Sequence, residues 1–552
     1  MQKNRWIACS LLLFSQSPLA AQPPNAASQI QQIPASPVRQ PALEDTAISP
    51  VEPAAIEQAY EDKIRVDVLK IAGAQAYPEE VLLGVAGFKA GDELTLNALR
   101  SMTKKIADYY HRNGYFVAQA YLPVQDIKEG RVIIAVLEGQ YGDLMLRNRS
   151  TLTDDLAHRM LNGLHHNDPI TAAPLEHALL SLSDIPGIKV QSTLIPGTNQ
   201  GYSDLIVEVA DGPRISGSID ADNAGNRYTG EGRIGATLNL NNPAGLGDQA
   251  TLRGLTSISG LNYLRAAYQS RIGNAKAGIA YSRLDYALGR DFAGLSAHGT
   301  ASIVTLYGNY PLIRSRNNNL NTQISLESRA FQDKVDLTSS VTDKKSQVLM
   351  LSLYGDHRDN RGAGGFNAYT LSWTTGQLNL QSPAMQSLDA ATAQSNGRYN
   401  KLGFGAIRLQ GVSTAASLYL SFSGQLAGKN LDVSEKMQLG GMNGVRAYPE
   451  GEAYADQGYL MNLEARYQLN NFSSGVMQLI GFVDAGSVNS NKYQWAAGAN
   501  RTTLSGAGVG VNWSATRSLV VKAFYARKLG NAIAQSAPDS AGRFWIQAVQ
   551  YF

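Results

Sequence analysis

The residues best suited to specific chemistry lie in a glycine-rich stretch at 440–452, which reads Gly-Gly-Met-Asn-Gly-Val-Arg-Ala-Tyr-Pro-Glu-Gly-Glu. It places one arginine, Arg446, beside an aromatic residue, Tyr448, among amphipathic segments. A guanidinium is suited to holding a carboxylate through paired hydrogen bonds. Catalytic patterns are missing, since the sequence has no Gly-x-x-x-x-Gly-Lys loop, no His-Glu-x-x-His motif and no Gly-x-Ser-x-Gly elbow. We therefore predict a protein that is not an enzyme and needs no nucleotide or cofactor.

Histidines gather in one region, but their spacing does not predict a metal site. Four of the seven are His158, His165, His166 and His177. They lack a clean spacing of two histidines and a carboxylate. Asp154 with His158, and Asp155 with Arg159, stand four residues apart and are better interpreted as surface pairs on a helix. We expect no metal.

The first residues have the composition of a secretory signal peptide. Lys3 and Arg5 precede the apolar run 6–14, and small residues follow at 18–21. Cleavage after residue 21 removes two of the 48 Lys and Arg, which leaves 46 against 45 Asp and Glu. This near-neutral balance argues against nucleic acid as a partner. The only cysteine, Cys9, lies within the predicted signal peptide, so the mature chain would need no disulfide.

A proline-rich segment at 22–63 follows, and we interpret it as a linker. Residues 22–53 contain seven of the chain's 20 prolines. This density argues against regular helix and for an extended segment.

Residues 64–212 have the pattern of two small α/β modules. In 64–139, strands are predicted at 64–71, 115–122 and 131–138, with an amphipathic helix at 94–113. The second unit, 140–212, repeats this plan with two helices and three strands. Two units of this size and order look like paired POTRA modules.

The region 213–552 has the period of two that marks half-buried strands. In 233–240 every second residue is apolar, and similar segments recur about every 20 residues. Sixteen strands result, with long polar connections such as 332–345 on one side and mostly short turns on the other. Their predicted starts lie near residues 214, 231, 248, 261, 273, 299, 320, 346, 366, 398, 414, 457, 477, 503, 518 and 543. We predict a sixteen-stranded antiparallel transmembrane β-barrel in a bacterial outer membrane. A soluble β-sandwich or propeller is the alternative, but neither requires this asymmetry.

The chain ends in an aromatic strand, Arg543 to Phe552. A terminal phenylalanine on the last strand is typical of barrels that close there and are recognised for insertion, so Phe552 is a candidate C-terminal signal. An ordinary terminal strand is the alternative. Gln550 departs from the lipid-facing register of the other residues in this strand.

Taken together, the chain from residue 64 onward resembles the outer-membrane transporters of two-partner secretion, the hemolysin secretion/activation family of the POTRA-plus-barrel superfamily. The likeness is most specific in two motifs, whose residues are Val445, Arg446, Ala447, Tyr448, Gly451 and Glu452 in the loop, and Phe482, Asp484 and Gly486 in a later strand. The resemblance implies that the loop reaches into the pore and that Arg446 meets Asp484 on the inner wall. A solvated loop arginine is the alternative.

Two departures from the family accompany this resemblance. Ala447 stands where glycine is commoner, which would matter if the position required a positive φ. Members also often place a helix in the pore as a plug, whereas the prolines of 22–53 leave little room for a long one.

The resemblance implies export of a large secreted partner of adhesin, hemolysin or hemagglutinin type. The modules would lie in the periplasm and capture the unfolded partner at an open sheet edge, although they could instead be rigid spacers. Outer-membrane lipid and the barrel-assembly machinery are further expected partners. The alternatives are a factor that assembles other barrels, which usually has more modules, and a passive porin or receptor, which would lack the modules and the loop.

Overall fold

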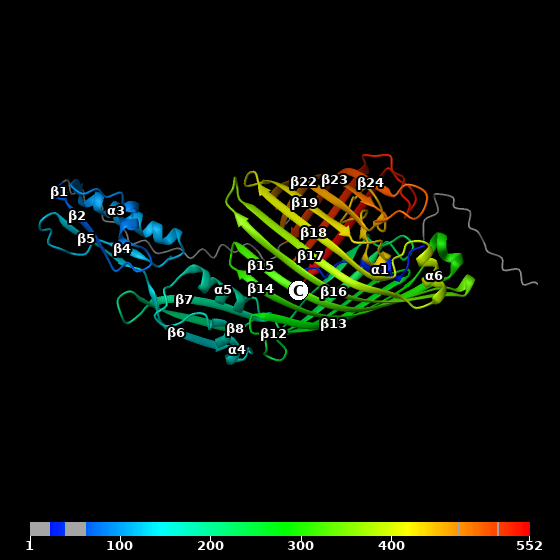
Figure 1. Ribbon diagram of the computed structural model, residues 1–552, viewed down its shortest axis with the longest axis horizontal. Coiled ribbons are helices and arrows are strands. Elements are labelled where there is room, and N and C mark those ends of the chain that lie inside the picture. The colour runs from blue at the N-terminus through cyan, green and yellow to red at the C-terminus, as the bar shows by residue number, and fades with distance from the viewer. Residues whose placement is uncertain (1–22, 39–61, 473–474, 516–517) are drawn as a thin grey trace, which may run out of the picture.

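The computed structural model describes residues 23–38, 62–472, 475–515 and 518–552. The molecule is elongated, with two small α/β modules in a row at one end and a large barrel at the other (Figure 1). The predicted signal peptide lies outside the described residues. Among the described helices, none has the length and hydropathy needed to span a bilayer.

The first module folds around the apolar face of one long helix. Thr95 caps this helix by accepting a hydrogen bond from the Ala98 N–H, and Leu99 and Ile106 are fully buried against the sheet. Sequence reasoning missed α2 and β3 here. The elements are β1 (Lys63–Val66), β2 (Val68–Ala72), α2 (Glu79–Ala86), β3 (Asp92–Thr95), α3 (Leu96–Arg112), β4 (Gln119–Tyr121) and β5 (Arg131–Leu137). They form sheets β1–β3 and β2–β5–β4.

The second module has one three-stranded sheet in the order β6–β8–β7, covered by two helices. Strands β6 and β8 are parallel, which the crossover through the helices makes possible. The elements are β6 (Gln140–Arg149), α4 (Asp154–Leu161), α5 (Ala172–Ser183), β7 (Ile188–Pro196) and β8 (Tyr202–Asp211).

Sixteen antiparallel strands close into the barrel, which confirms the predicted fold class. Each observed start lies close to the predicted one, with the largest difference at β16, where 346 was expected and Ser340 is found. The strands are β9 (Ile215–Asp222), β10 (Arg233–Asn241), β11 (Gln249–Ser257), β12 (Leu261–Ile272), β13 (Ala275–Ala287), β14 (Ala297–Arg314), β15 (Asn318–Val335), β16 (Ser340–Asp359), β17 (Gly365–Leu380), β18 (Gly397–Gly411), β19 (Ala416–Ala427), β22 (Gln457–Phe472), β23 (Gly475–Asn489), β24 (Arg501–Ala515), β25 (Leu519–Lys528) and β26 (Gly542–Tyr551).

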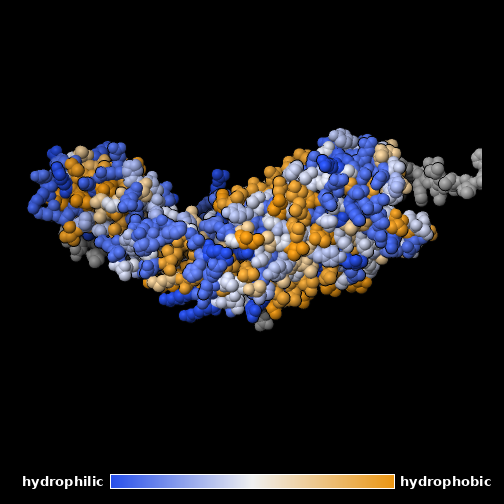
Figure 2. Space-filling model, turned by 60° about the horizontal axis from the view of Figure 1, so that its bottom comes forward, coloured by the Kyte–Doolittle hydropathy of each residue, from blue (hydrophilic) through white to orange (hydrophobic). Residues whose placement is uncertain are grey.

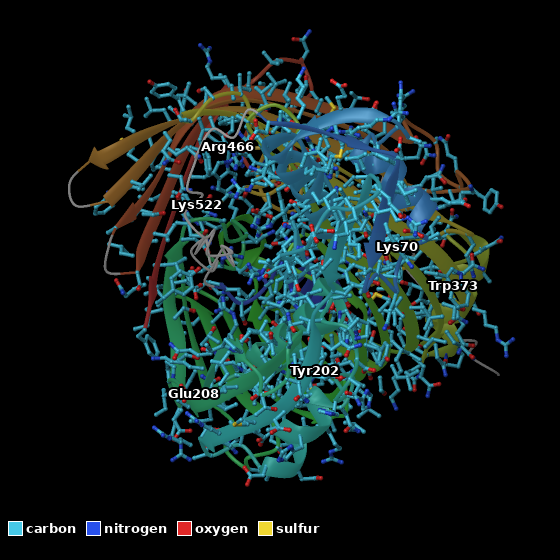
Figure 3. The ribbon with its side chains drawn as sticks, turned by 90° about the vertical axis from the view of Figure 1, so that its left-hand side faces the viewer. Lys70, Tyr202, Glu208, Trp373, Arg466 and Lys522 are labelled. Atoms are coloured by element: carbon cyan, nitrogen blue, oxygen red, sulfur yellow. The ribbon has the colours of Figure 1, made fainter. Side chains whose placement is uncertain are left out.

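Alternation along each strand separates a lipid face from a lumen face. On β22 and β23, Leu463 and Val483 are exposed cross-strand neighbours on the outside, whereas Glu464 and Asp484 are buried on the inside. Hydrophobic residues accordingly gather over the outside of the barrel strands (Figure 2). In the view from the module end, Trp373 lies at the periphery of the barrel, and Arg466 and Lys522 lie nearer its interior (Figure 3).

Connections at the module end are short, whereas several at the far end are long and structured. The far end carries α6 (Pro383–Ala391) and the 3₁₀ turns η1 (Arg290–Leu295) and η2 (Asp336–Thr338). One expected long loop, 332–345, is instead mostly strand, because β15 and β16 extend until only 336–339 remains between them.

The barrel closes through a short contact between β9 and β26. These strands pair over five residues, from Gln547 opposite Asp222 to Tyr551 opposite Ser218. Phe552 continues the contact, since its backbone exchanges two hydrogen bonds with that of Gly217. On its other side β9 is held by two buried ion pairs, Asp220–Arg253 and Asp222–Arg233.

A short helix, α1 (Ala26–Gln31), packs against the lumen side of β13, β14 and β15. This corrects the expectation that proline density prevents helix in 22–53. The six residues of α1 contain no proline, and Asn25 and Ser28 form a capping box. The segment then returns toward the module end, where Tyr551 donates a hydrogen bond to the Val38 carbonyl. Within the part of the chain that the structure describes, the helix in the pore is this six-residue one.

Candidate functional site

The connection between β19 and β22, residues 428–456, folds back into the barrel, and we call it the latch loop. It contains η3 (Val433–Glu435) and a small hairpin of β20 (Met437–Gln438) and β21 (Tyr454–Ala455). This hairpin brings the two ends of the glycine-rich stretch together. The stretch itself packs in a buried cluster with residues of β22 to β26.

The Arg446 guanidinium lies between two carboxylates of the barrel wall. Its Nε and Nη2 donate to the two oxygens of Asp484 at 2.9 and 2.7 Å, and its Nη1 donates to Glu464 Oε1 at 2.8 Å. The backbone N–H of Arg446 also donates to Asp484, at 3.0 Å. Because Asp484 is fully buried, these bonds are shielded from competing water. The structure thus brings together the two residues that the resemblance implied.

Aromatic side chains complete the setting of Arg446. Its Cζ lies 3.4 Å from the ring centre of Phe482 and 5.0 Å from that of Phe524. Trp545 on the last strand donates from Nε1 to the Arg446 carbonyl at 2.7 Å. The barrel wall therefore binds both the side chain and the backbone of Arg446.

The neighbours of Arg446 are buried as well. Val445 and Ala447 are completely buried, and the Ala447 methyl group packs where Gly506 leaves space. Ala447 is not among the described residues with positive φ, so the glycine common in the family is not required at this backbone position. Tyr448 is also buried and donates from its hydroxyl to the Ala532 carbonyl.

Gly451 and Glu452 connect the latch loop to residues 529–541, the connection between β25 and β26. Gly451 has φ +78°, a conformation that favours glycine, and turns the chain so that Glu452 points at residues 529–541. The Glu452 carboxylate accepts hydrogen bonds from the backbone of Gln535 and from the backbone and hydroxyl of Ser536. At Gly486, an added Cβ would lie 2.3 Å from Leu439 Cδ1, so this glycine lets the loop lie against β23.

Phe552, the remaining predicted site residue, is not part of this cluster. It lies at the module end, and its side chain is 58% exposed beside Gly217. Phe552 forms the last backbone pair of the β9–β26 contact that closes the barrel.

A second set of ion pairs attaches the latch loop to the opposite wall. Glu435, nearly fully buried, receives Arg329 of β15 at 2.5 Å and Lys401 of β18 at 2.9 Å. Asp432 receives Lys344 of β16 at 2.8 Å. The loop therefore crosses the lumen and is held on both sides. Sequence reasoning missed these residues, because two acids in a polar loop carry no local mark of a partner.

The latch loop also contacts α1, so the two segments occupy the lumen together. Gln31 donates to the Val433 carbonyl at 2.7 Å, and the Tyr454 hydroxyl donates to the Ser28 carbonyl at 3.3 Å. Displacing α1 therefore removes contacts of the latch loop as well.

The position of Glu464 on the lumen wall could have been predicted from the alternation of residues along β22. Leu460, Asn462, Glu464 and Arg466 alternate with apolar residues on β22, so they belong to the lumen face. Arg466 pairs with Glu464 at 2.7 Å, which supplies a second cation beside the two carboxylates. The arrangement holds the loop against the barrel wall. Among the described residues no group of His, Cys, Asp and Glu could hold a metal ion.

We expect the latch loop to be held more weakly as pH rises through neutrality. Glu450 lies in the loop, outside the membrane-spanning strands, and burial raises its pKa to about 7, with nearby Asp222 adding to the effect. A raised pKa favours the neutral carboxyl in the docked loop, so stabilisation is lost between pH 4.5 and pH 7. With Val445→Cys as a buried reporter, the rate of thiol labelling in the purified protein is divided at each pH by that of the unfolded protein, which removes the pH dependence of the thiolate itself. This ratio should be higher at pH 8 than at pH 5.5, and Glu450→Gln should flatten the difference. A Glu450→Gln protein with the same pH profile would contradict this.

Comparison with family models supports the same interpretation. Residues 201–513 match the family described as haemolysin secretion/activation protein ShlB/FhaC/HecB, and residues 64–139 match the POTRA domain of ShlB type.

Curated relatives agree. The heme/hemopexin transporter protein HuxB of Haemophilus influenzae strain 86-028NP is 30% identical over 472 residues, which is 84% of this chain and 82% of the relative. The outer membrane transporter CdiB of Escherichia coli strain 536 is 23% identical and covers 75% of this chain and 72% of the relative.

Two solved structures share the fold. CdiB from Escherichia coli has a TM-score of 0.70 at 19% identity and covers 91% of this chain and 93% of its own. BamA from Haemophilus ducreyi has a TM-score of 0.52 at 14% identity, with 89% and 100% covered.

The family match covers more than half of the chain, and the relatives are named as transporters rather than enzymes. Members of this family place the barrel in the outer membrane and the POTRA modules in the periplasm. The chain belongs to the ShlB/FhaC/HecB haemolysin secretion/activation family, and it is an outer-membrane transporter of two-partner secretion that moves a secreted partner protein to the cell surface.

Proposed function

We propose that the partner is a large protein that enters unfolded from the periplasm and passes through the lumen once the latch loop and α1 have moved. The observation that carries this proposal is the position of Arg446, a single buried cation that attaches a lumen-crossing loop to the wall. Such a loop has two natural arrangements, docked and released, and transport requires both: the chain passes while the loop is released, and the loop must dock again before the next cycle begins.

The POTRA modules supply the first contact with the partner in this proposal. Strand β7 stands at one edge of the sheet β6–β8–β7, and β4 stands at one edge of β2–β5–β4. An extended chain can add to such an edge through main-chain hydrogen bonds with little demand on sequence. This mode of binding suits an unfolded partner in a compartment without ATP.

The class of partner is proposed from the relatives. Relatives named as heme/hemopexin transporters favour a partner that handles heme or hemopexin, within the broader adhesin, hemolysin or hemagglutinin type. We further propose the division 1–21 signal peptide, 22–63 linker, 64–139 and 140–212 POTRA modules and 213–552 barrel. Phe552, at the end of the closing seam, is proposed as the signal read by the barrel-assembly machinery, and the apolar outer face as the lipid contact.

Deleting the gene is expected to abolish release of one secreted protein, the one encoded beside it. Partner antigen should disappear from the medium and return on complementation, while the amounts of other outer-membrane proteins stay unchanged by immunoblot. A general loss of outer-membrane proteins would instead support an assembly factor. Unchanged secretion would support a passive pore.

A further inference from the structure

A polar cavity of about 260 Å³ lies where the second POTRA module meets the rim of the barrel. On the module side, Ser181 lies in the last turn of α5 and Asp184 directly follows that helix. On the barrel side, the lumen faces of β12 to β14 supply Arg271, Lys276 and Arg314. The cavity is therefore bounded by two parts of the molecule, which also meet through their chain connection, the turn at 242–248 and contacts of Glu176 with Arg316 and of His177 with Asn274.

Arg271 reaches this cavity with an unsatisfied guanidinium. It is 8% exposed, its Nε has no hydrogen-bond partner, and its guanidinium forms no ion pair with any described residue. The aliphatic part of the Arg271 side chain packs close to Gly247 and Leu156. The space is tight, since a Cβ added at Gly247 would lie 3.3 Å from both Arg271 Cδ and Leu156 Cδ2. Burying a charge without a partner is costly, so an occupant that pairs with Arg271 would be strongly favoured.

A second cation stands directly opposite. Arg271 and Lys276 are cross-strand partners on β12 and β13, and like charges in this position destabilise a sheet. Lys276 likewise forms no hydrogen bond or ion pair with a described residue. The Ser181 hydroxyl, which also faces the cavity, is buried without a partner.

The acidic groups at the cavity are already engaged. Asp184 accepts two hydrogen bonds from Arg314, at 2.7 and 2.8 Å. Asp356 accepts one from the Asn319 amide at 3.0 Å. Asp184 attracts Arg271 and Lys276 electrostatically but bonds to neither of them. Three cations therefore face two carboxylates, and neither carboxylate is hydrogen-bonded to Arg271 or Lys276.

We propose that this cavity is a binding site for a small oxyanion, held by Arg271, Lys276 and Ser181. Two oxygens of one ligand would meet the guanidinium and the ammonium, and a third would accept from the hydroxyl of α5. The lumen-facing position restricts the source to a free anion such as phosphate or to the carboxylate of an acidic side chain on a passing polypeptide. An occupant bridges module and barrel, so binding would stabilise the docked orientation of the module.

Isothermal titration of the purified full-length protein in detergent with sodium phosphate tests the proposal. We expect one saturable site, with affinity lowered at least tenfold in Arg271→Met. The control is Arg265→Met, on the same strand and lumen face, where the guanidinium already bonds to Ser282, and its affinity should be unchanged. If Arg271→Met does not fold, Lys276→Gln replaces it with the same expected loss.

Two further titrations distinguish the sources of the oxyanion. The capped tripeptide acetyl-Gly-Glu-Gly-amide should displace phosphate if the site accepts side-chain carboxylates, and its glutamine counterpart should not. Phosphate binding without displacement assigns the site to a free anion. Absence of saturable binding of both phosphate and the glutamate peptide, or equal affinity in wild type and Arg271→Met, overturns the proposal.

Discussion

Replacing Arg446 by alanine is expected to reduce secretion of the partner to background while the barrel still inserts into the outer membrane. The change removes three charge-assisted hydrogen bonds and leaves Asp484 and Glu464 buried on neighbouring strands, where the ion pair of Arg466 is with Glu464 alone. Removing one partner of a buried ion pair costs about 3–5 kcal/mol. A loss of that size shifts the docked loop toward the released state by at least about a hundredfold, so the loop no longer returns to the docked arrangement that the transport cycle requires.

The barrel itself should tolerate this substitution, because its strands are held by main-chain ladders that Arg446 does not join. Secretion is measured by immunoblot of the medium, and insertion by the heat-modifiable mobility of the folded barrel. Lys429→Ala is the matched control, since Lys429 lies in the same loop but donates only to a backbone carbonyl. Normal secretion by the Arg446→Ala strain would contradict the proposal that attachment of the latch loop by Arg446 is needed for transport.

Replacing Asp484 by alanine should have an equally large effect on secretion. Asp484 accepts from the Arg446 side chain and backbone and from the Asn462 amide, so the wall loses three of the four hydrogen bonds that its carboxylates accept from Arg446. Exchanging the charges, with Arg446→Asp and Asp484→Arg together, should not restore secretion. An arginine at 484 cannot accept from the backbone N–H of residue 446, and an aspartate at 446 would face Glu464.

A double-mutant cycle quantifies this coupling. Arg446→Met, Asp484→Asn and the pair of changes are compared by the rate at which protease cleaves the latch loop in the purified protein. The effects should be far from additive, because either change alone already breaks the same contact. Additive effects would show that the ion pair does not hold the loop.

Local patterns predicted the elements because their physical causes are local. A strand that faces lipid on one side and the lumen on the other must alternate, so each barrel strand could be recognised within its own residues. Helix α3 could be predicted for the same reason, because the apolar residues of its buried face recur at helical spacing. The failure at α1 has the opposite cause, since the proline count was averaged over 22–53 and hid six proline-free residues.

Contacts between distant segments could not be predicted in this way. Nothing near Asp432 or Glu435 indicates Lys344, Arg329 or Lys401, which lie on strands that only barrel closure brings across the lumen. Arg446 and Asp484 were paired in advance only because their motifs resemble those of a family. The cavity at Arg271 likewise exists only where a module docks on the rim.

Alternation and helical spacing along the chain establish sixteen amphipathic strands behind two α/β modules, and the motifs point to a loop with one arginine. Only the folded arrangement shows that this loop is attached to both walls, shares the lumen with α1, and leaves Arg271 and Lys276 at the rim without hydrogen bonds to the described residues. Periodicity records which face of an element is buried, whereas the partner of a buried charge depends on how the closed barrel and the docked module place residues that are far apart along the chain.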